Sequence, residues 1–114
     1  MDQVEISLPR TKVVEGDSFA VTANFRDRTT STGAAPTTVD YRVDCLTTGI
    51  VVKGWTAAAV DASVDISMDS SFSAIQSRAN KTERKQLTVR ANKDGFSQVS
   101  GRARWIVANQ DFMP

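Results

Sequence analysis

The sequence contains no histidine and only one cysteine, and these two shortages remove much of the usual chemistry of enzymes and metal sites. Histidine is the commonest general base and the usual metal-binding imidazole. With Cys45 alone, the chain can form neither an internal disulfide nor a thiolate zinc cage. Such a chain suits folding in a reducing cytoplasm, although a secreted domain without disulfides would look the same.

Long apolar runs and a large net charge are missing as well. No stretch approaches the ~20 apolar residues of a membrane-spanning helix. Met1–Glu5 lacks the basic start and the apolar run of a signal peptide. The formal net charge is only +1, which gives no strong overall attraction to nucleic acid or to anionic membranes. We therefore expect a soluble protein without a signal peptide that binds neither membrane nor nucleic acid.

The dominant pattern in the sequence is a two-residue alternation of apolar and polar side chains, which is typical of half-buried β-strands. It predicts seven strands, near residues 4–8, 19–26, 39–45, 50–55, 64–68, 87–91 and 99–107. Val13 and Val14 form a short continuation of the first strand. One short helical crossover is predicted within 70–84, because Phe72 and Ile75 stand three residues apart.

Turn residues separate these strands about every ten residues, a spacing typical of antiparallel sandwiches. The expected fold is an all-β, antiparallel, immunoglobulin-like β-sandwich over residues 1–109, followed by a C-terminal tail over 110–114. A small barrel is the alternative. Each large apolar side chain buried between the two layers contributes roughly 1.5–3 kcal/mol. The predicted large members of the core are Phe19, Phe25, Tyr41, Trp55, Leu87 and Trp105.

The carboxylates are numerous but scattered, so no catalytic, cofactor or metal site is predicted. Asp40 and Asp44 lie on the outward side of one strand, where a flat sheet supplies no cleft for a glycosidase pair. Asp61, Asp65 and Asp69 are spread along a strand and its ends, whereas calcium needs several oxygens converging from one loop. The serines have no histidine to activate them.

The basic residues indicate a surface for another protein. If strands 39–45, 87–91 and 99–107 share a sheet, their outward side chains form one face. Guanidinium groups pair with carboxylates in fixed geometry, which suits a protein–protein contact, although ordinary surface charge is the alternative. No aromatic side chain is expected among these arginines, which disfavours nucleic-acid binding. The predicted face comprises Asp40, Arg42, Asp44, Thr88, Arg90, Arg102, Arg104 and Ile106.

Three further segments are candidates for contact with a partner. The tail carries Phe112 and Met113, and exposed apolar tails often dock on a neighbour. The alternative is that Phe112 folds back on its own domain or that the tail is disordered. The polar Thr29–Pro36 loop and the N-terminal end of the chain complete the set.

Several segments together resemble a known group of proteins. They are Val14-Glu15-Gly16-Asp17-Ser18-Phe19, Val39-Asp40-Tyr41-Arg42-Val43-Asp44, Trp55, Glu83-Arg84-Lys85-Gln86-Leu87-Thr88-Val89 and Trp105-Ile106-Val107-Ala108-Asn109. This pattern, over nearly the whole chain, is similar to small immunoglobulin-like proteins encoded among the structural genes of tailed bacteriophages. The lone Cys45 departs from antibody domains, which carry a buried cysteine pair.

The resemblance implies a non-enzymatic component of the virion, made in the host cytoplasm. The expected function is that of a capsid decoration or cement protein, which binds capsid proteins of the assembled particle and can form a homo-oligomer on it. A neck or tail accessory protein, bound to neck or tail proteins, is the first alternative. A carbohydrate-binding module for host attachment is the second, and it is disfavoured because both tryptophans follow buried-face patterns.

Overall fold

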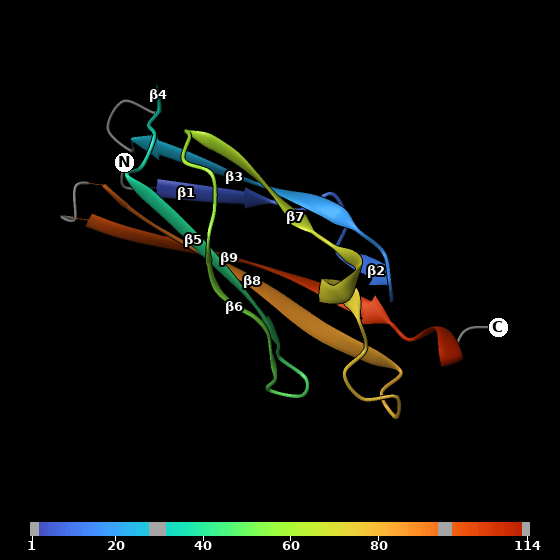
Figure 1. The fold of residues 1–114 in the computed structure, drawn as a ribbon. Coiled ribbons are helices and arrows are strands. Elements are labelled where there is room, and N and C mark those ends of the chain that lie inside the picture. Colours follow the sequence, from blue (N-terminus) through green and yellow to red (C-terminus); the bar gives the residue numbers. More distant parts are fainter. Residues whose placement is uncertain (1–2, 28–31, 94–96, 113–114) are drawn as a thin grey trace.

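The computed structural model describes residues 3–27, 32–93 and 97–112, and in them the strands form two sheets that face each other (Figure 1). The smaller sheet contains β1 (Gln3–Ser7), β3 (Phe19–Asp27), β4 (Thr32–Gly33) and β7 (Ser63–Met68). The larger sheet runs in the order β2 (Lys12–Val14), β9 (Ser97–Ala108), β8 (Thr82–Lys93), β5 (Thr38–Cys45) and β6 (Val51–Ala57). The seven predicted strands are all present, and the all-β class is confirmed.

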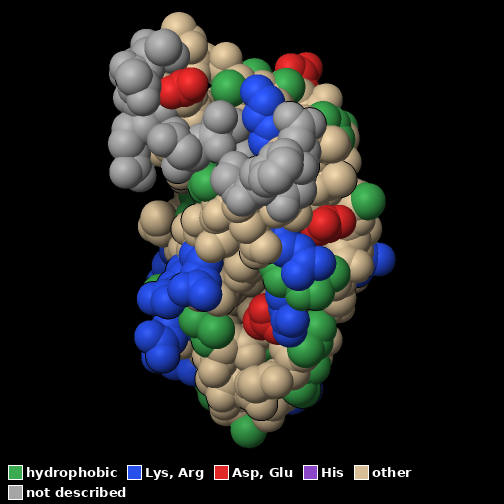
Figure 2. Space-filling view, turned by 90° about the vertical axis from the view of Figure 1, so that its left-hand side faces the viewer, with side chains coloured by type: hydrophobic (Ala, Val, Ile, Leu, Met, Phe, Trp, Pro, Cys, Tyr) green, Lys and Arg blue, Asp and Glu red, His purple; other side chains and the backbone are tan. Residues whose placement is uncertain are grey.

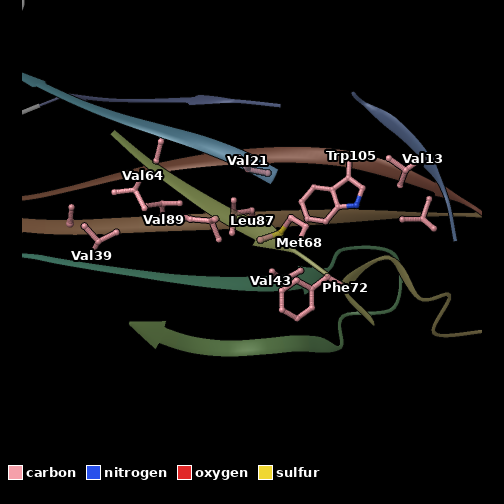
Figure 3. Packing of buried hydrophobic residues seen from close by; sticks show 14 of the residues in the cluster. Val13, Val21, Val39, Val43, Val64, Met68, Phe72, Leu87, Val89 and Trp105 are labelled. Carbon is pink, nitrogen blue, oxygen red and sulfur yellow. The ribbon is translucent and has the colours of Figure 1, made fainter. Parts of the chain in front are cut away.

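The core lies between the two layers, and the alternating pattern explains which side chains reach it. Phe25, Leu87 and Trp105 are buried as predicted, and Cys45 is a buried free thiol. Trp105 points from β9 into the interior between Val13 and Met68 (Figure 3). Its ring meets the ring of Phe19 edge-on, with centroids 5.4 Å apart, a geometry favoured by aromatic quadrupoles. Phe19 and Tyr41 are partly buried against this core.

The β2 strand corrects the prediction of a purely antiparallel fold. β2 pairs with β9 in parallel, with Val13 opposite Val107, and the backbone N–H of Ile106 donates to Thr11 O at 2.9 Å. Pro9 cannot donate to a sheet ladder, and it lies between β1 in the smaller sheet and β2 in the larger one. The chain therefore changes layers there without reversing direction, which places it parallel to β9.

The helical crossover predicted within 70–84 is present only as a single short turn. Only η1, a 3-10 turn over Ser70–Ser73, is helical, and β8 already begins at Thr82. Phe72 and Ile75 are both buried, so their spacing reflects burial without a longer helix. The backbone N–H groups that follow η1 find another acceptor, since those of Gln76 and Ser77 donate to the Glu83 carboxylate at 2.7 and 3.0 Å.

Trp55 is the main error in the predicted core, because 39% of its surface is exposed. In β6 the partly buried positions are Val52 and Thr56, so Trp55 takes the outward phase. The pairing of β6 with β5 shifts register between Tyr41 and Val43 and again before Asp44. β6 is the edge strand of the larger sheet, and its outward phase brings an aromatic ring to the surface.

Gly101 lets β1 approach β9 closely. A Cβ atom built there would lie 2.9 Å from Ile6 Cδ1 and 3.0 Å from Val4 Cγ1. We expect Gly101→Val to lower the free energy of unfolding by about 1–3 kcal/mol, the usual effect of overpacking, as measured by urea denaturation. Gly54→Ala is the control, because a Cβ atom at Gly54 meets nothing within 4 Å. Equal denaturation midpoints for the two variants would contradict this reading of Gly101.

Candidate binding face

The outward side of the larger sheet brings the predicted arginines together. β9, β8 and β5 are adjacent, and their register places Arg42 opposite Thr88 and Thr88 opposite Arg102. The neighbouring rows carry Arg90 beside Asp40 and Arg104 beside Gln86. We call this surface the basic face. Its charged and apolar members are Lys12, Asp40, Arg42, Asp44, Trp55, Arg84, Arg90, Arg102, Arg104 and Ile106.

Positive charge is concentrated on the basic face. It carries six cations and two carboxylates, although the formal charge of the whole chain is only +1. Figure 2 shows Lys and Arg side chains at several places in this view, with the largest group at its lower left. The local charge, and not the net charge, therefore governs what this surface attracts.

Two arginines of this face, Arg42 and Arg90, contact the ring of Trp55. The guanidinium carbon of Arg90 lies 3.8 Å from the centroid of the Trp55 ring, and that of Arg42 lies 5.6 Å from it. Both distances fall within the ~6 Å range of a cation–π contact, and Trp is the strongest aromatic partner. The indole and the two guanidinium groups thus form one exposed cluster, which we call the Trp55 cluster.

Two carboxylates hold the arginines of the Trp55 cluster in place. Arg42 donates to Asp44 through two bonds, of 3.0 Å from Nε and 2.7 Å from the terminal nitrogen. This hydrogen-bonded carboxylate raises the pKa of Arg42. Arg90 Nε lies 3.6 Å from Asp40 Oδ2, directly across the strand pair. Because the side chains are already ordered, less freedom is lost when a partner binds.

Two of the remaining predicted residues of the face line a shallow hollow on β9 and its neighbours. Arg104 and Ile106 line it together with Lys12 and Arg84. Arg104 Nε donates to Gln86 Oε1 at 2.8 Å, and Ile106 is exposed. In the described part of the chain, Arg102 and Arg84 have no carboxylate partner, so their charges are open to an external anion.

The tail is held against the domain as far as the structure describes it. Gln110–Phe112 forms a second 3-10 turn, η2. Arg78 ties this turn down by contacting Asp111 at 2.6 Å and Glu15 at 2.6 Å. Hydrogen bonds from Arg78 lower the pKa of Glu15. Phe112 remains 47% exposed.

Some predicted contact segments lie outside the described residues. Met113 is one of them, as are the outermost residues at both ends and positions 29–31 of the Thr29–Pro36 loop. The described part of that loop contains β4 and the buried Pro36.

The exposed Trp55 overturns two arguments made from the sequence. An aromatic ring does stand among the arginines, so the stated reason against nucleic-acid binding is wrong. The stated reason against sugar binding is wrong too, since Trp55 is not buried. The position of Arg90 affects the binding of nucleic acid and of sugar alike. Arg90 covers a face of the indole at 3.8 Å, so a base or sugar ring stacking on that face must first displace it.

Sequence reasoning also missed a buried ionic cluster, which we call the Glu83 cluster. Glu83 and Lys85 are both fully buried and lie 3.2 Å apart. The Glu83 carboxylate also accepts from Asn80 Nδ2 at 2.9 Å, from Cys45 Sγ at 3.7 Å, and from the Gln76 and Ser77 N–H groups. The signal was available, because positions 83 and 85 continue the inward phase of Leu87, Val89 and Ala91.

The pKa of Glu83 follows from two opposed effects. Burial raises it, but the backbone N–H groups of Gln76 and Ser77, the Asn80 amide and the Lys85 ammonium together lower it to about 2. A carboxylate that accepts several hydrogen bonds is stabilised in its charged form. The cluster therefore keeps an ion pair in the interior and ties the 74–81 segment to β8.

Within the described ranges, no three acidic or cysteine side chains come together as metal ligands. The described helices are all too short to cross a membrane. Comparisons with models of protein families, with curated proteins and with solved structures found no match to the chain.

Proposed function

We propose that this chain is a non-enzymatic adhesive domain that uses the basic face to bind a repeated acidic site on the assembled particle of a tailed bacteriophage. In this proposal it is a capsid decoration or cement protein with an immunoglobulin-like fold. The strand order supports the fold, since β1, β3 and β7 share one sheet and β9, β8, β5 and β6 follow one another in the other. Immunoglobulin variable domains place their A, B, E and G, F, C, C′ strands in this way.

The Trp55 cluster is the observation that carries the binding proposal. Tryptophan and arginine are, with tyrosine, the residues enriched among interface hot spots. Here an exposed tryptophan is stacked by Arg90, and both neighbouring arginines are held by carboxylates. The excess positive charge of the basic face comes from residues around this cluster that form no ion pair within the described residues, namely Lys12, Arg84, Arg102 and Arg104. An ordered basic surface is complementary to an acidic protein surface.

Binding of this domain would stabilise the assembled particle through mass action. A subunit that binds only the assembled shell stabilises that state. Repetition of the site over the particle, together with a homo-oligomer of this chain, would raise the overall affinity without any new contact. A neck or tail accessory protein would use the same face, and a map of the intact particle separates the two locations.

Carbohydrate binding is the second candidate, and the exposure of Trp55 is the observation that favours it. A sugar would have to stack on the indole beside or in place of Arg90, which lies 3.8 Å from the ring. An acidic protein surface needs no such displacement, because it can pair with Arg84 and Arg102, which have no carboxylate partner in the described part of the chain. The geometry therefore favours the protein partner.

Co-sedimentation with purified capsids of the encoding phage tests the proposed function. We expect saturable binding that weakens as salt is raised, because the Debye length falls from ~10 Å at 0.1 M to ~3 Å at 1 M ionic strength. Arg102→Glu should weaken it about tenfold or more by placing a like charge against the acidic partner. Arg26→Glu is the matched control, since Arg26 is an exposed strand residue of the opposite sheet.

Two results would refute the proposal. If the protein neither sediments with capsids nor is found in virions, the structural role in the particle is wrong. If Arg26→Glu weakens binding as much as Arg102→Glu does, the basic face is not the contact surface. Binding to a glycan array that is lost on Trp55→Ala, in the absence of capsid binding, would support the carbohydrate-binding candidate.

A further inference from the structure

A second surface feature lies beyond the Trp55 cluster, at the end of the larger sheet where β2, β9 and β8 meet η2. It is a groove of about 520 Å³, a size within the range of ligand-binding clefts. Its floor includes Val14 and Ala108, which face each other across β2 and β9. The exposed ring of Phe112 lines the groove as well. The groove thus offers a small apolar floor on the surface.

The rim of this groove is basic. Arg10, Lys12 and Lys81 line it, and the single carboxylate among the lining residues is that of Asp17. Asp17 is already engaged, since its Oδ2 accepts the Val14 N–H at 3.0 Å and lies 4.0 Å from Arg10. Across the part of the chain that the structure describes, Lys12 and Lys81 have no ion-pair partner. Two ammonium groups are therefore free to receive carboxylates.

The backbone edge of β2 is closed beside this floor. The Val14 N–H donates to the Asp17 side chain, and the Asp17 N–H donates to Val14 O at 3.0 Å. A partner strand could not pair with the backbone of Val14 without breaking these bonds, which is a common way to protect a sheet edge. An occupant must instead lie over the floor and use its side chains.

We propose that this groove binds an acidic peptide segment of a partner protein. An apolar side chain of the segment would rest on Val14, Ala108 and Phe112, and carboxylates on either side would pair with Lys12 and Lys81. The hollow beside Ile106 shares Lys12 with the groove, so an extended segment has room to continue along β9. This inference rests on the groove alone and does not depend on the phage assignment.

The test is an NMR titration of the ¹⁵N-labelled full chain with a synthetic peptide that alternates aspartate with leucine and phenylalanine. We expect shift changes confined to residues 12–14, 81–82, 108 and 112. The double variant K12E/K81E should weaken binding about tenfold or more, because it turns two attractive charges repulsive. Phe112→Ala should weaken it a few-fold by removing apolar contact. Lys93→Glu, an exposed charge at the far end of β8, is the matched control and should bind as the native chain does.

The ligand class is tested with three other probes. A peptide with lysine in place of aspartate should not bind, and decanoate and an oligothymidylate should bind the groove more weakly than the acidic peptide. Tighter binding of either, shift changes centred elsewhere, no binding at millimolar peptide, or insensitivity to K12E/K81E would overturn the proposal. Retention of the native amide spectrum shows that each variant is folded. Capsid co-sedimentation of Lys81→Glu, which changes the groove alone, and of Arg102→Glu, which changes the basic face alone, separates the two surfaces.

Discussion

Replacing Glu83 with glutamine should lower the free energy of unfolding by about 3–5 kcal/mol, the usual effect of removing one partner of a buried ion pair. The carboxylate accepts hydrogen bonds from Lys85, Asn80 and the backbone of Gln76 and Ser77. In glutamine, an NH2 group replaces one of the two carboxylate oxygens. A hydrogen-bond donor then faces the donors that the carboxylate accepted from. The substitution also leaves the fully buried Lys85 ammonium without a countercharge. Chemical denaturation of the purified variant measures the loss.

Two companion variants show whether the ion pair carries this effect. Lys85→Met removes the buried ammonium and leaves Glu83 with its backbone and Asn80 donors, so we expect a smaller loss than for Glu83→Gln. The double variant E83Q/K85M should recover part of the stability lost in Glu83→Gln, because no buried charge remains unpaired. A double variant that is as unstable as the sum of its parts would show that Glu83 and Lys85 act independently.

The Glu83 carboxylate should also determine part of the loss of stability of the native protein in acid. The pKa of Glu83 falls from its usual 4.5 to about 2 on folding, so the unfolded chain binds the extra proton first as the pH drops. The stabilisation is therefore fully present above pH ~4.5 and is lost progressively towards pH ~2; it is on the order of 3 kcal/mol at 1.36 kcal/mol per pKa unit. In Glu83→Gln this part of the acid dependence should disappear. Parallel stability curves for the two proteins between pH 5 and pH 2 would contradict this origin.

The fold was predictable where burial alone decides the pattern. Val21, Ala23 and Phe25 alternate with polar residues and are all buried, so periodicity located β3 correctly. Periodicity gave the wrong result where the pairing of backbone strands determines the structure. The layer change after Pro9 depends on which sheet edge is free, and the outward turn of Trp55 accompanies register shifts between β5 and β6. Neither the change of sheet nor the outward orientation of Trp55 can be predicted from the local alternation of side chains.

The candidate sites were predictable to different degrees for the same reason. Arg42, Arg90, Arg102 and Arg104 occupy the outward phase of strands that became neighbours, so strand phase alone placed them on one face. The groove combines Lys12, Lys81 and Phe112, which come from three distant segments joined only by the tertiary fold. The Glu83 cluster depends on how the 74–81 segment folds over β8, where a buried carboxylate takes the place of helical hydrogen bonds.

The largest expected effect on binding comes from Trp55→Ala. Truncating a central tryptophan in an interface usually removes at least about 2 kcal/mol of binding free energy, or roughly thirty-fold in Kd at 1.4 kcal/mol per tenfold. Here the indole also positions Arg90, which is stacked 3.8 Å from it, so its loss should free that guanidinium as well. We expect capsid affinity, measured by co-sedimentation at constant salt, to fall about thirty-fold or more.

Matched variants separate a specific role of Trp55 from a general loss of apolar surface. Val51 lies on the same strand and is 50% exposed, so Val51→Ala removes exposed apolar surface without touching the arginines and should leave the affinity within about threefold. Trp55→Phe keeps a ring under Arg90 and should retain an intermediate affinity, since phenylalanine is a weaker cation–π partner. All three variants should unfold at nearly the native denaturant concentration, because neither Val51 nor Trp55 belongs to the buried core. Equal losses of capsid binding for Val51→Ala and Trp55→Ala would mean that β6 contributes apolar area alone, and the arginine–tryptophan cluster would then not be the binding determinant.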